Sequence, residues 1–332
     1  MGKFRSSVLE KKMLGCDAAK QDHVIIGSNH HKKVKGVGKF SSYRLGEVLK
    51  KRYGDLVGRE YNADTIAVQS SATERTTSTA KLVLNGLFAQ PLSVQANYTV
   101  TSKPYELNLV NSYCPAYLEE LNCQLNSNEA QFILKNNEQL LQSLRNYTGR
   151  RYESFKELLF LYHAFISEEA LNLTLPSWSQ EVYELLKYMA ILQLKTENGN
   201  LLLKRLNGGR MLKKMIDNMQ NAILATSEFK KMKMVLYSAH EFNIVNILSA
   251  LNVFEDHFPK FNSAVIIELY HHPLNNKYYV KLFYIRDVFT EAEVLSIPSC
   301  SLLCDFKSFK NILEPIVPLN YTKECRSNIL LD

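Results

Sequence analysis

The sequence has no long apolar run, and no segment reaches the ~18 consecutive apolar residues that a bilayer-spanning helix needs. Before residue 40 the best apolar run is Val24-Ile25-Ile26, and the residues from Met1 to Ser7 are largely polar. A secretory signal peptide requires a longer apolar stretch, so none is visible in this chain. The sequence also has no internal repeat and no low-complexity tract, which argues against a repeat architecture.

A strong charge bias is missing from most of the chain, although the net charge is +7. Residues 1–39 contain nine Lys and Arg against three Asp and Glu, so the rest of the chain is nearly neutral. No basic, aromatic-rich pattern recurs along the sequence, and we therefore expect no nucleic-acid partner. With 46% hydrophobic residues in 332, the chain can bury a sizeable core as one large α/β domain or two smaller ones.

Two segments have the pattern of a strand that runs into a helix, with polar chemistry at the turn. An apolar run from residue 234 leads into His240 and Glu241, and apolar residues then recur at helical spacing. The segment Asp64–Ser70 leads in the same way into a polar turn that contains Arg75. A guanidinium beside an imidazole and a carboxyl group suits phosphate binding with proton transfer to a leaving oxygen. The alternative is that Arg75 is a solvated charge and His240 a hydrogen-bonded loop histidine.

Together with their flanks, these segments resemble the histidine acid phosphatase family, and most closely its insect venom members. The resemblance runs from about Val34 to Cys325. The matching motifs, in chain order, are Tyr43–Gly54, Gln69–Thr76, Leu175–Trp178, Gly208–Gly209 and Tyr237–His240. The resemblance implies an α/β fold of the phosphoglycerate mutase type, with a central, mostly parallel sheet, flanking helices and a helical insert domain.

The family hydrolyses phosphomonoesters through a phosphohistidine, without a metal or other cofactor. Carried over to this chain, the resemblance implies that Arg75 binds phosphate, that His240 stabilises the phosphoryl group and that Glu241 donates a proton. The expected ligand is a small phosphomonoester or inorganic phosphate. The acid is an aspartate in the family, so Glu241 lengthens it by one methylene group.

The family's defining sequence, Arg-His-Gly-x-Arg, is absent, and with it the nucleophilic histidine and two phosphate-clamping arginines. His30 and His31 follow a possible short strand, but Lys32 and Lys33 offer point charges where the family has planar guanidinium groups. We therefore predict a phosphatase scaffold with weak or no turnover. The alternative is a non-catalytic secreted protein that binds phosphate or a phosphoester.

Six cysteines and four Asn-x-Thr sequons bear on the compartment. By resemblance, Cys114 pairs with Cys325 and Cys300 with Cys304, whereas Cys16 and Cys123 have no assigned partner. The sequons are Asn97, Asn146, Asn172 and Asn320. These features and the family favour a secreted or lysosomal glycoprotein. The alternative is that all six cysteines are free thiols in a reducing compartment.

The segment pattern predicts a division of the chain into three parts. Residues 1–33 form an unmatched basic segment, residues 34–125 and 223–332 the α/β core, and residues 126–222 a helical insert. Within the core, two aromatic and β-branched runs around residues 273–276 predict a hairpin. Within the insert, Ser177–Gln180 has a capping-box pattern that would open a helix, and His163 is expected to be a packed core histidine. Nothing in the sequence indicates an oligomeric state.

Overall fold

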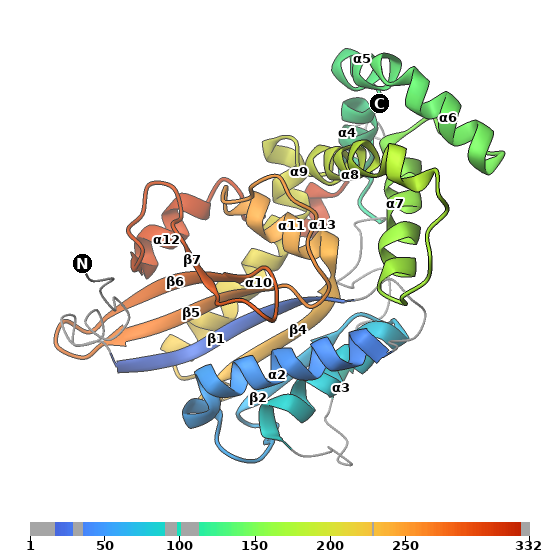
Figure 1. Cartoon of the computed structure of the whole chain (residues 1–332). Coiled ribbons are helices and arrows are strands. Elements are labelled where there is room, and N and C mark those ends of the chain that lie inside the picture. The colour runs from blue at the N-terminus through green and yellow to red at the C-terminus, as the bar shows by residue number, and fades with distance from the viewer. Residues whose placement is uncertain (1–16, 29–35, 90–97, 101–112, 228, 327–332) are drawn as a thin grey trace, which may run out of the picture.

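The computed structural model describes residues 17–28, 36–89, 98–100, 113–227 and 229–326 (Figure 1). Within these ranges an eight-stranded sheet forms the centre of the molecule, in the order β3-β2-β4-β1-β5-β6-β7, with β8 paired to β6. The strands are β1 (Asp17–Ser28), β2 (Ile66–Ser70), β3 (Tyr98–Val100), β4 (Met234–His240), β5 (Ala264–His272), β6 (Lys277–Ile285), β7 (Glu293–Leu295) and β8 (Cys304–Asp305).

The sheet is mixed in direction. Strands β3, β2, β4 and β1 run parallel to one another, whereas β5 is antiparallel to β1 and the neighbours beyond it pair antiparallel. The predicted α/β architecture is therefore correct, with an antiparallel continuation on one side of the parallel strands. Strands β5 and β6 are joined through residues 273–276, which confirms the predicted hairpin.

The sequence pattern placed residues 1–33 outside the α/β core, and this boundary is wrong for residues 17–28. Strand β1 lies inside the sheet, parallel to β4 and antiparallel to β5. Its polar first half, Asp17–His23, obscured the strand, because only the run Val24–Ile26 is continuously apolar. The core therefore begins before residue 34.

Helices cover both faces of the sheet. Successive side chains of a strand point to opposite faces, so the buried residues of β4 alternate between two hydrophobic clusters. Met234 and Leu236 pack with α2 (Gly36–Val57) and α3 (Glu74–Phe88) on one face. Val235 and Tyr237 pack with α10 (Gly208–Ile223), α11 (Glu241–Ala250) and α12 (Phe306–Leu313) on the other. A strand that is buried on both faces accounts for the nearly continuous apolar run before His240.

The helices between the two parts of the core have a hydrophobic cluster of their own, contributed chiefly by α7 and α8. The helices are α4 (Pro115–Leu125), α5 (Asn128–Asn136), α6 (Glu138–Thr148), α7 (Phe155–Glu169), α8 (Ser179–Thr196) and α9 (Leu201–Leu206). They lie beyond one end of the sheet (Figure 1). Helix α10 packs on the sheet, so the core resumes at Gly208 rather than after residue 222. A short helix, α13 (Tyr321–Glu324), lies near the C-terminal end of the described chain.

Candidate active site

The turn between β4 and α11 holds the first pair of candidate groups. Strand β4 ends at His240 and α11 begins at the next residue, Glu241. The backbone N–H of His240 donates to Oδ1 of Asn243 at 3.1 Å, which fixes the first turn of the helix. Only 1% of His240 and 4% of Glu241 are exposed, so both side chains sit in a site largely shielded from water.

The turn between β2 and α3 is joined directly to this site. The backbone N–H of Ser71 donates to the carbonyl oxygen of Ser238 at 3.1 Å, and the Ser238 hydroxyl donates to the carbonyl of Thr76 at 2.7 Å. Helix α3 starts at Glu74, which places Arg75 in its first turn. Because β2 and β4 are parallel neighbours, their carboxyl ends bring Arg75 and His240 to the same edge of the sheet.

Arg75 and Ser71 hold the imidazole of His240 from two sides. Nη2 of Arg75 lies 3.2 Å from Nδ1, and Oγ of Ser71 lies 3.1 Å from Nε2. A guanidinium group only donates hydrogen bonds, so Nδ1 must accept, and the neutral ring carries its hydrogen on Nε2. That hydrogen is then donated to Ser71, whose hydroxyl is also 2.7 Å from Oγ1 of Thr76. This assignment of the tautomer follows from the donors around the ring.

Two further side chains line the site from the α11 and insert side. The ring of Phe242 stacks on His240, with centroids 5.1 Å apart. Oε1 of Glu241 lies 3.6 Å from Nε2 of His163, which comes from α7. The sequence predicted His163 only as a packed core histidine. Its buried position is as expected, but its ring adjoins the candidate proton donor, and no local pattern in the sequence indicated this.

Burial and charge both act on the ionisable groups of the site. Burial lowers the pKa of Arg75, and the nearby Glu241 carboxylate opposes this effect. Burial raises the pKa of Glu197 at the end of α8 to about 7, and the Glu241 charge adds to this rise. A hydrogen bond of 2.9 Å from Gln193 to Oε1 of Glu197 acts in the opposite direction. The described part of the site therefore combines an arginine with two histidines and two carboxyl groups.

The end of β1 lies at the same edge of the sheet. Ser28, its last residue, is paired in register with His240. Helix α2, which contains the matching motif Tyr43–Gly54, begins at Gly36. His30 and His31 lie between these two elements in the sequence but outside the described residues.

Comparison with known proteins gives the family. The model of the histidine phosphatase superfamily (branch 2) matches residues 15–285. The chain belongs to this family. Venom acid phosphatase of Apis mellifera is 29% identical over 300 residues, which cover 87% of this chain and 76% of that protein. Prostatic acid phosphatase of Rattus norvegicus is 28% identical over 302 residues, covering 85% and 77%.

Solved structures agree on the fold. The phytase from Citrobacter braakii superimposes with a TM-score of 0.69 at 13% identity, covering 94% of this chain and all of that one. The Klebsiella phytase gives 0.68 at 14% identity, covering 92% and 98%. At these identities the likeness supports the α/β fold alone. The family match begins at residue 15 and so includes β1, in agreement with the corrected boundary.

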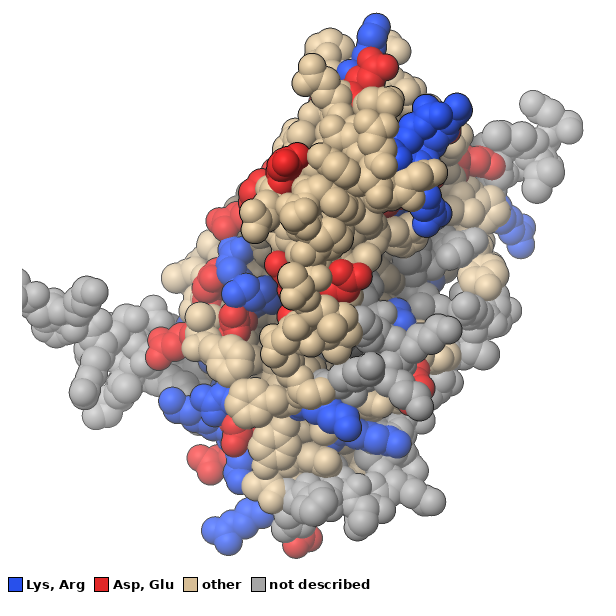
Figure 2. Space-filling model, turned by 45° about the vertical axis from the view of Figure 1, so that its right-hand side comes forward, with Lys and Arg blue, Asp and Glu red and all other residues tan. Residues whose placement is uncertain are grey.

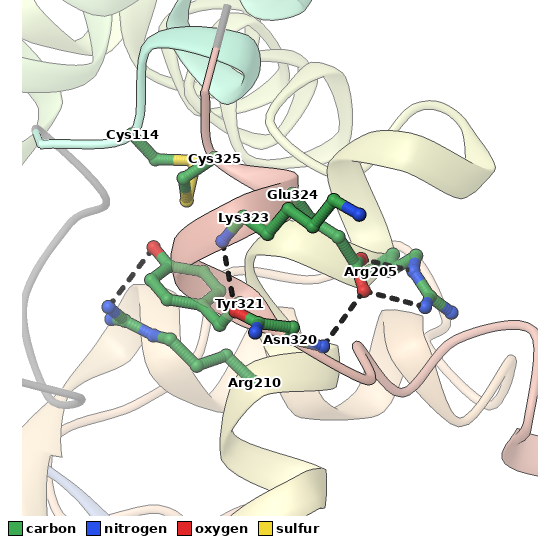
Figure 3. Close-up of a disulfide and its surroundings, with 8 residues drawn as sticks. All are labelled: Cys114, Arg205, Arg210, Asn320, Tyr321, Lys323, Glu324 and Cys325. Carbon is green, nitrogen blue, oxygen red and sulfur yellow. Dashed lines mark hydrogen bonds and ion pairs between the residues drawn. A yellow bond between two sulfur atoms is a disulfide. The ribbon is translucent and has the colours of Figure 1, made fainter.

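Both expected disulfides are present, Cys114–Cys325 and Cys300–Cys304. The first joins the start of α4 to the end of α13 (Figure 3). Cys123 is an exposed free thiol, and Cys16 lies outside the described residues. The disulfides contradict the alternative in which all six cysteines are free.

The described chain shows where three of the four sequons lie and how charged side chains are distributed over one face. The sequon residues Asn146, Asn172 and Asn320 are exposed, whereas Asn97 lies outside the described residues. In Figure 2, Lys and Arg side chains are interspersed with Asp and Glu over the described part of the visible face. Over the described ranges, no helix is long and apolar enough to cross a membrane, and no cluster of His, Cys, Asp and Glu suits a metal ion.

Proposed function

We propose that this chain binds phosphomonoesters at the Arg75–His240 site and hydrolyses them slowly. The observation that supports this most directly is the 3.2 Å contact between the Arg75 guanidinium and the His240 imidazole, one residue from a buried carboxyl group. Membership of the histidine phosphatase superfamily makes a phosphate ester the natural ligand class.

Each group has a distinct role in this proposal. The guanidinium fork of Arg75 binds two phosphoryl oxygens and offsets the charge that spreads over them in the transition state. His240 donates a hydrogen bond to the phosphoryl group once the ligand displaces one of its present partners. Glu241 protonates the oxygen of the departing alcohol. The buried site strengthens each of these interactions relative to water.

Turnover is slow because the chain lacks Arg-His-Gly-x-Arg. Without the nucleophilic histidine of that sequence, water must attack the phosphoryl group directly, and fewer positive charges hold it. In a serine protease, which also forms a covalent intermediate, loss of the nucleophile costs roughly six decades of rate. A second candidate function is therefore phosphate or phosphoester binding without chemistry, which uses the same Arg75 and His240.

The proposal also covers the cellular compartment in which the protein resides. The two disulfides favour an oxidising environment, and three of the four sequons are exposed in the described chain. Similar proteins are named as venom, prostatic and lysosomal acid phosphatases. We propose secretion or delivery to the lysosome, with glycosylation at Asn146, Asn172 and Asn320. Mobility on gels before and after removal of N-linked glycans tests this in the protein expressed through an insect secretory pathway.

Ligand binding and turnover are measured separately to test the proposal. Calorimetry with inorganic phosphate and with tungstate at pH 5 is expected to give saturable binding that Arg75→Ala and His240→Ala both weaken at least tenfold. The control is Arg59→Ala, which removes an exposed arginine after the end of α2. Absence of saturation at millimolar ligand contradicts the binding proposal.

Turnover is measured as release of 4-nitrophenol from its phosphate ester at pH 5. We expect a rate far below that of an intact acid phosphatase, sensitive to Arg75→Ala. His30→Ala and His31→Ala form a separate arm, because the two histidines fall in the segment that replaces the family's catalytic loop. Brisk turnover that is lost with His240→Ala contradicts slow hydrolysis, and its additional loss with either N-terminal variant identifies a substitute nucleophile.

A further inference from the structure

The proposed proton donor faces a histidine from the helical insert. Oε1 of Glu241 and Nε2 of His163 are 3.6 Å apart, and the two residues are 4% and 9% exposed. The His163 ring is also in contact with aromatic rings, with centroid distances of 5.4 Å to Phe258 and 6.5 Å to Phe160. Packing therefore fixes the imidazole on α7 with one nitrogen directed at the first residue of α11.

Three other ionisable side chains of the described chain lie near Glu241. Arg75 from α3 favours the ionised carboxylate, whereas Glu197 at the end of α8 disfavours it. His240 adjoins it at the end of β4, with Nδ1 already facing Arg75. His163 from α7 faces the carboxyl oxygen itself, and an imidazole can both accept and release a proton near neutral pH.

We propose that His163 and Glu241 share one proton, and that His163 is a positioning residue which reloads the proton donor. The inference rests on the proposed hydrolysis at this site. In the reaction, the carboxyl O–H bond of Glu241 breaks as the leaving alkoxide oxygen gains the proton. The pair is then left as a carboxylate and a neutral imidazole. A hydronium ion from bulk water protonates His163, and the Nε2–H bond of this imidazolium breaks as the Glu241 carboxylate regains the shared proton.

Sharing has two consequences that simple packing of His163 would not have. An imidazolium and a carboxylate stabilise each other, so the pair loses its last proton at a higher pH than Glu241 alone would. The upper pH limit of turnover is therefore set by the pair. In addition, loss of the proton held by the pair slows poor leaving groups most, because 4-nitrophenolate departs without much help from an acid.

The first experiment does not depend on turnover. In protein labelled with ¹³C at histidine Cε1, the resonance of His163 is assigned by its disappearance in His163→Gln, and its titration is followed from pH 4 to 9. We expect the midpoint to fall by about one pH unit in Glu241→Gln, because the partner charge is gone. The control is His257, which lies 2.7 Å from the hydroxyl of Tyr284, and its midpoint should stay unchanged. An unchanged His163 midpoint in Glu241→Gln overturns the proposal.

The second experiment compares leaving groups. His163→Gln is expected to lower kcat for 2-glycerophosphate about tenfold and to leave 4-nitrophenyl phosphate within about twofold, with the upper pH limit moved down by about one unit. The double variant with Glu241→Gln should be no slower than Glu241→Gln alone. Equal losses for both esters, with an unshifted pH profile, overturn the reloading role.

The two proposals fail in different ways. If neither ester is turned over at all, the hydrolytic function is wrong, and the titration still decides whether the two side chains share a proton. Thermal melts show whether His163→Gln is less stable than the unaltered protein. If it is, His163→Asn takes its place in the kinetic comparison, and the titration of His163 in Glu241→Gln tests proton sharing. His257→Gln serves as the kinetic control, because it removes a histidine that also packs between rings but lies outside the site.

Discussion

Arg75 is the residue on which ligand binding depends most. Its guanidinium combines a charge with a planar fork, and it is held against His240 in a half-buried turn. A lysine keeps the charge but offers a point donor, which a phosphoryl group cannot engage through two parallel hydrogen bonds. The geometry of the fork is therefore as important as its charge.

We predict that Arg75→Lys weakens phosphate binding about tenfold at pH 5, where both side chains are charged. Calorimetric titration with phosphate measures this, with Arg59→Lys as the matched exposed control. Affinity within a factor of two of the unaltered protein would mean that charge alone is sufficient.

The buried carboxyl group of Glu197 makes the free energy of unfolding depend on pH. Burial raises its folded-state pKa to about 7 from an ordinary value of 4.5. The folded protein thus keeps a proton that the unfolded chain releases, so the contribution to stability is complete below pH 4.5 and is lost as pH rises through 7. The full shift corresponds to roughly 3 kcal/mol, and partial solvent access of this side chain lowers the expected loss to about 1–3 kcal/mol.

Urea unfolding at pH 4.5 and 7.5 tests this prediction. Glu197→Gln should remove that part of the pH dependence, because the amide does not titrate. Glu184→Gln, on the exposed face of the same helix, is the matched control and should keep it. A pH dependence that is identical in Glu197→Gln and the unaltered protein would contradict the assignment.

At the residue scale, the sequence predicted Arg75, His240 and Glu241 because each follows a recognisable strand. It could not predict the nearness of His163 or Glu197. Both lie on insert helices, and the side of an amphipathic helix that meets a neighbouring domain depends on tertiary packing. Buried positions recur at helical spacing along α7 whichever neighbour its buried side contacts, so this spacing does not identify the neighbour.

At the scale of elements, α3 is positioned by close contact with α2. A Cβ atom on Gly46 would lie 2.1 Å from the carbonyl oxygen of Val83, and one on Gly86 would lie 2.1 Å from that of Tyr43. The two backbones therefore touch where the helices cross. This contact sets the separation between α2 and α3, the helix that carries Arg75 in its first turn.

We predict that Gly46→Ala destabilises the fold by ~3 kcal/mol or more, because the methyl group must push two backbones apart. It should also weaken phosphate binding by displacing Arg75. Gly54→Ala, on the same helix with only the flexible Lys50 side chain at 3.7 Å, should instead gain about 0.5–1 kcal/mol from helix propensity. Chemical unfolding of both variants measures the contrast, and similar values for the two would exclude the crossing as the cause.

Helix ends were only partly predictable. The capping box expected at Ser177–Gln180 is displaced, because α8 starts at Ser179 and Trp178 occupies the N-cap without a side-chain bond. The same four-residue pattern does supply the N-cap of α7, where the Ser154 hydroxyl accepts from the backbone N–H of Glu157 and donates to its carboxylate at 3.1 Å. The four-residue pattern occurs at both places, and the local sequence does not distinguish them.

At the scale of the whole molecule, a disulfide and an ion pair link the C-terminal segment to helices α4 and α9. Cys325 is bonded to Cys114, and Arg205 of α9 makes a two-point ion pair with Glu324 at 2.6 and 3.0 Å (Figure 3). The disulfide links positions 211 residues apart, so its closure removes a large part of the disorder of the unfolded chain.

We predict that Cys114→Ser with Cys325→Ser lowers the free energy of unfolding by up to about 5 kcal/mol, the chain-entropy value for a loop of this length. Urea unfolding under non-reducing conditions measures it. Cys123→Ser, which removes an exposed free thiol, is the matched control and should change stability by less than ~0.5 kcal/mol. A loss below ~1 kcal/mol in the double variant would show that the ion pair and packing alone hold the segment.

The sequence predicted the α/β class, the hairpin and both disulfides, mostly through resemblance to the family. It indicated only a short strand before His30 and did not place β1 in the core sheet. A strand that lies between two others can tolerate polar residues along half of its length when neighbouring main chains satisfy its hydrogen bonds. Only pairing with β4 and β5, both more than 200 residues further along the chain, reveals its place.

That placement has a consequence during synthesis. The ribosome delivers β1 more than 200 residues before either of its neighbours, β4 and β5. Until then its main-chain donors and acceptors are open to other nascent chains, and contacts of such long sequence separation form slowly. Newly made protein should accordingly depend on chaperones until β4 and β5 have left the exit tunnel.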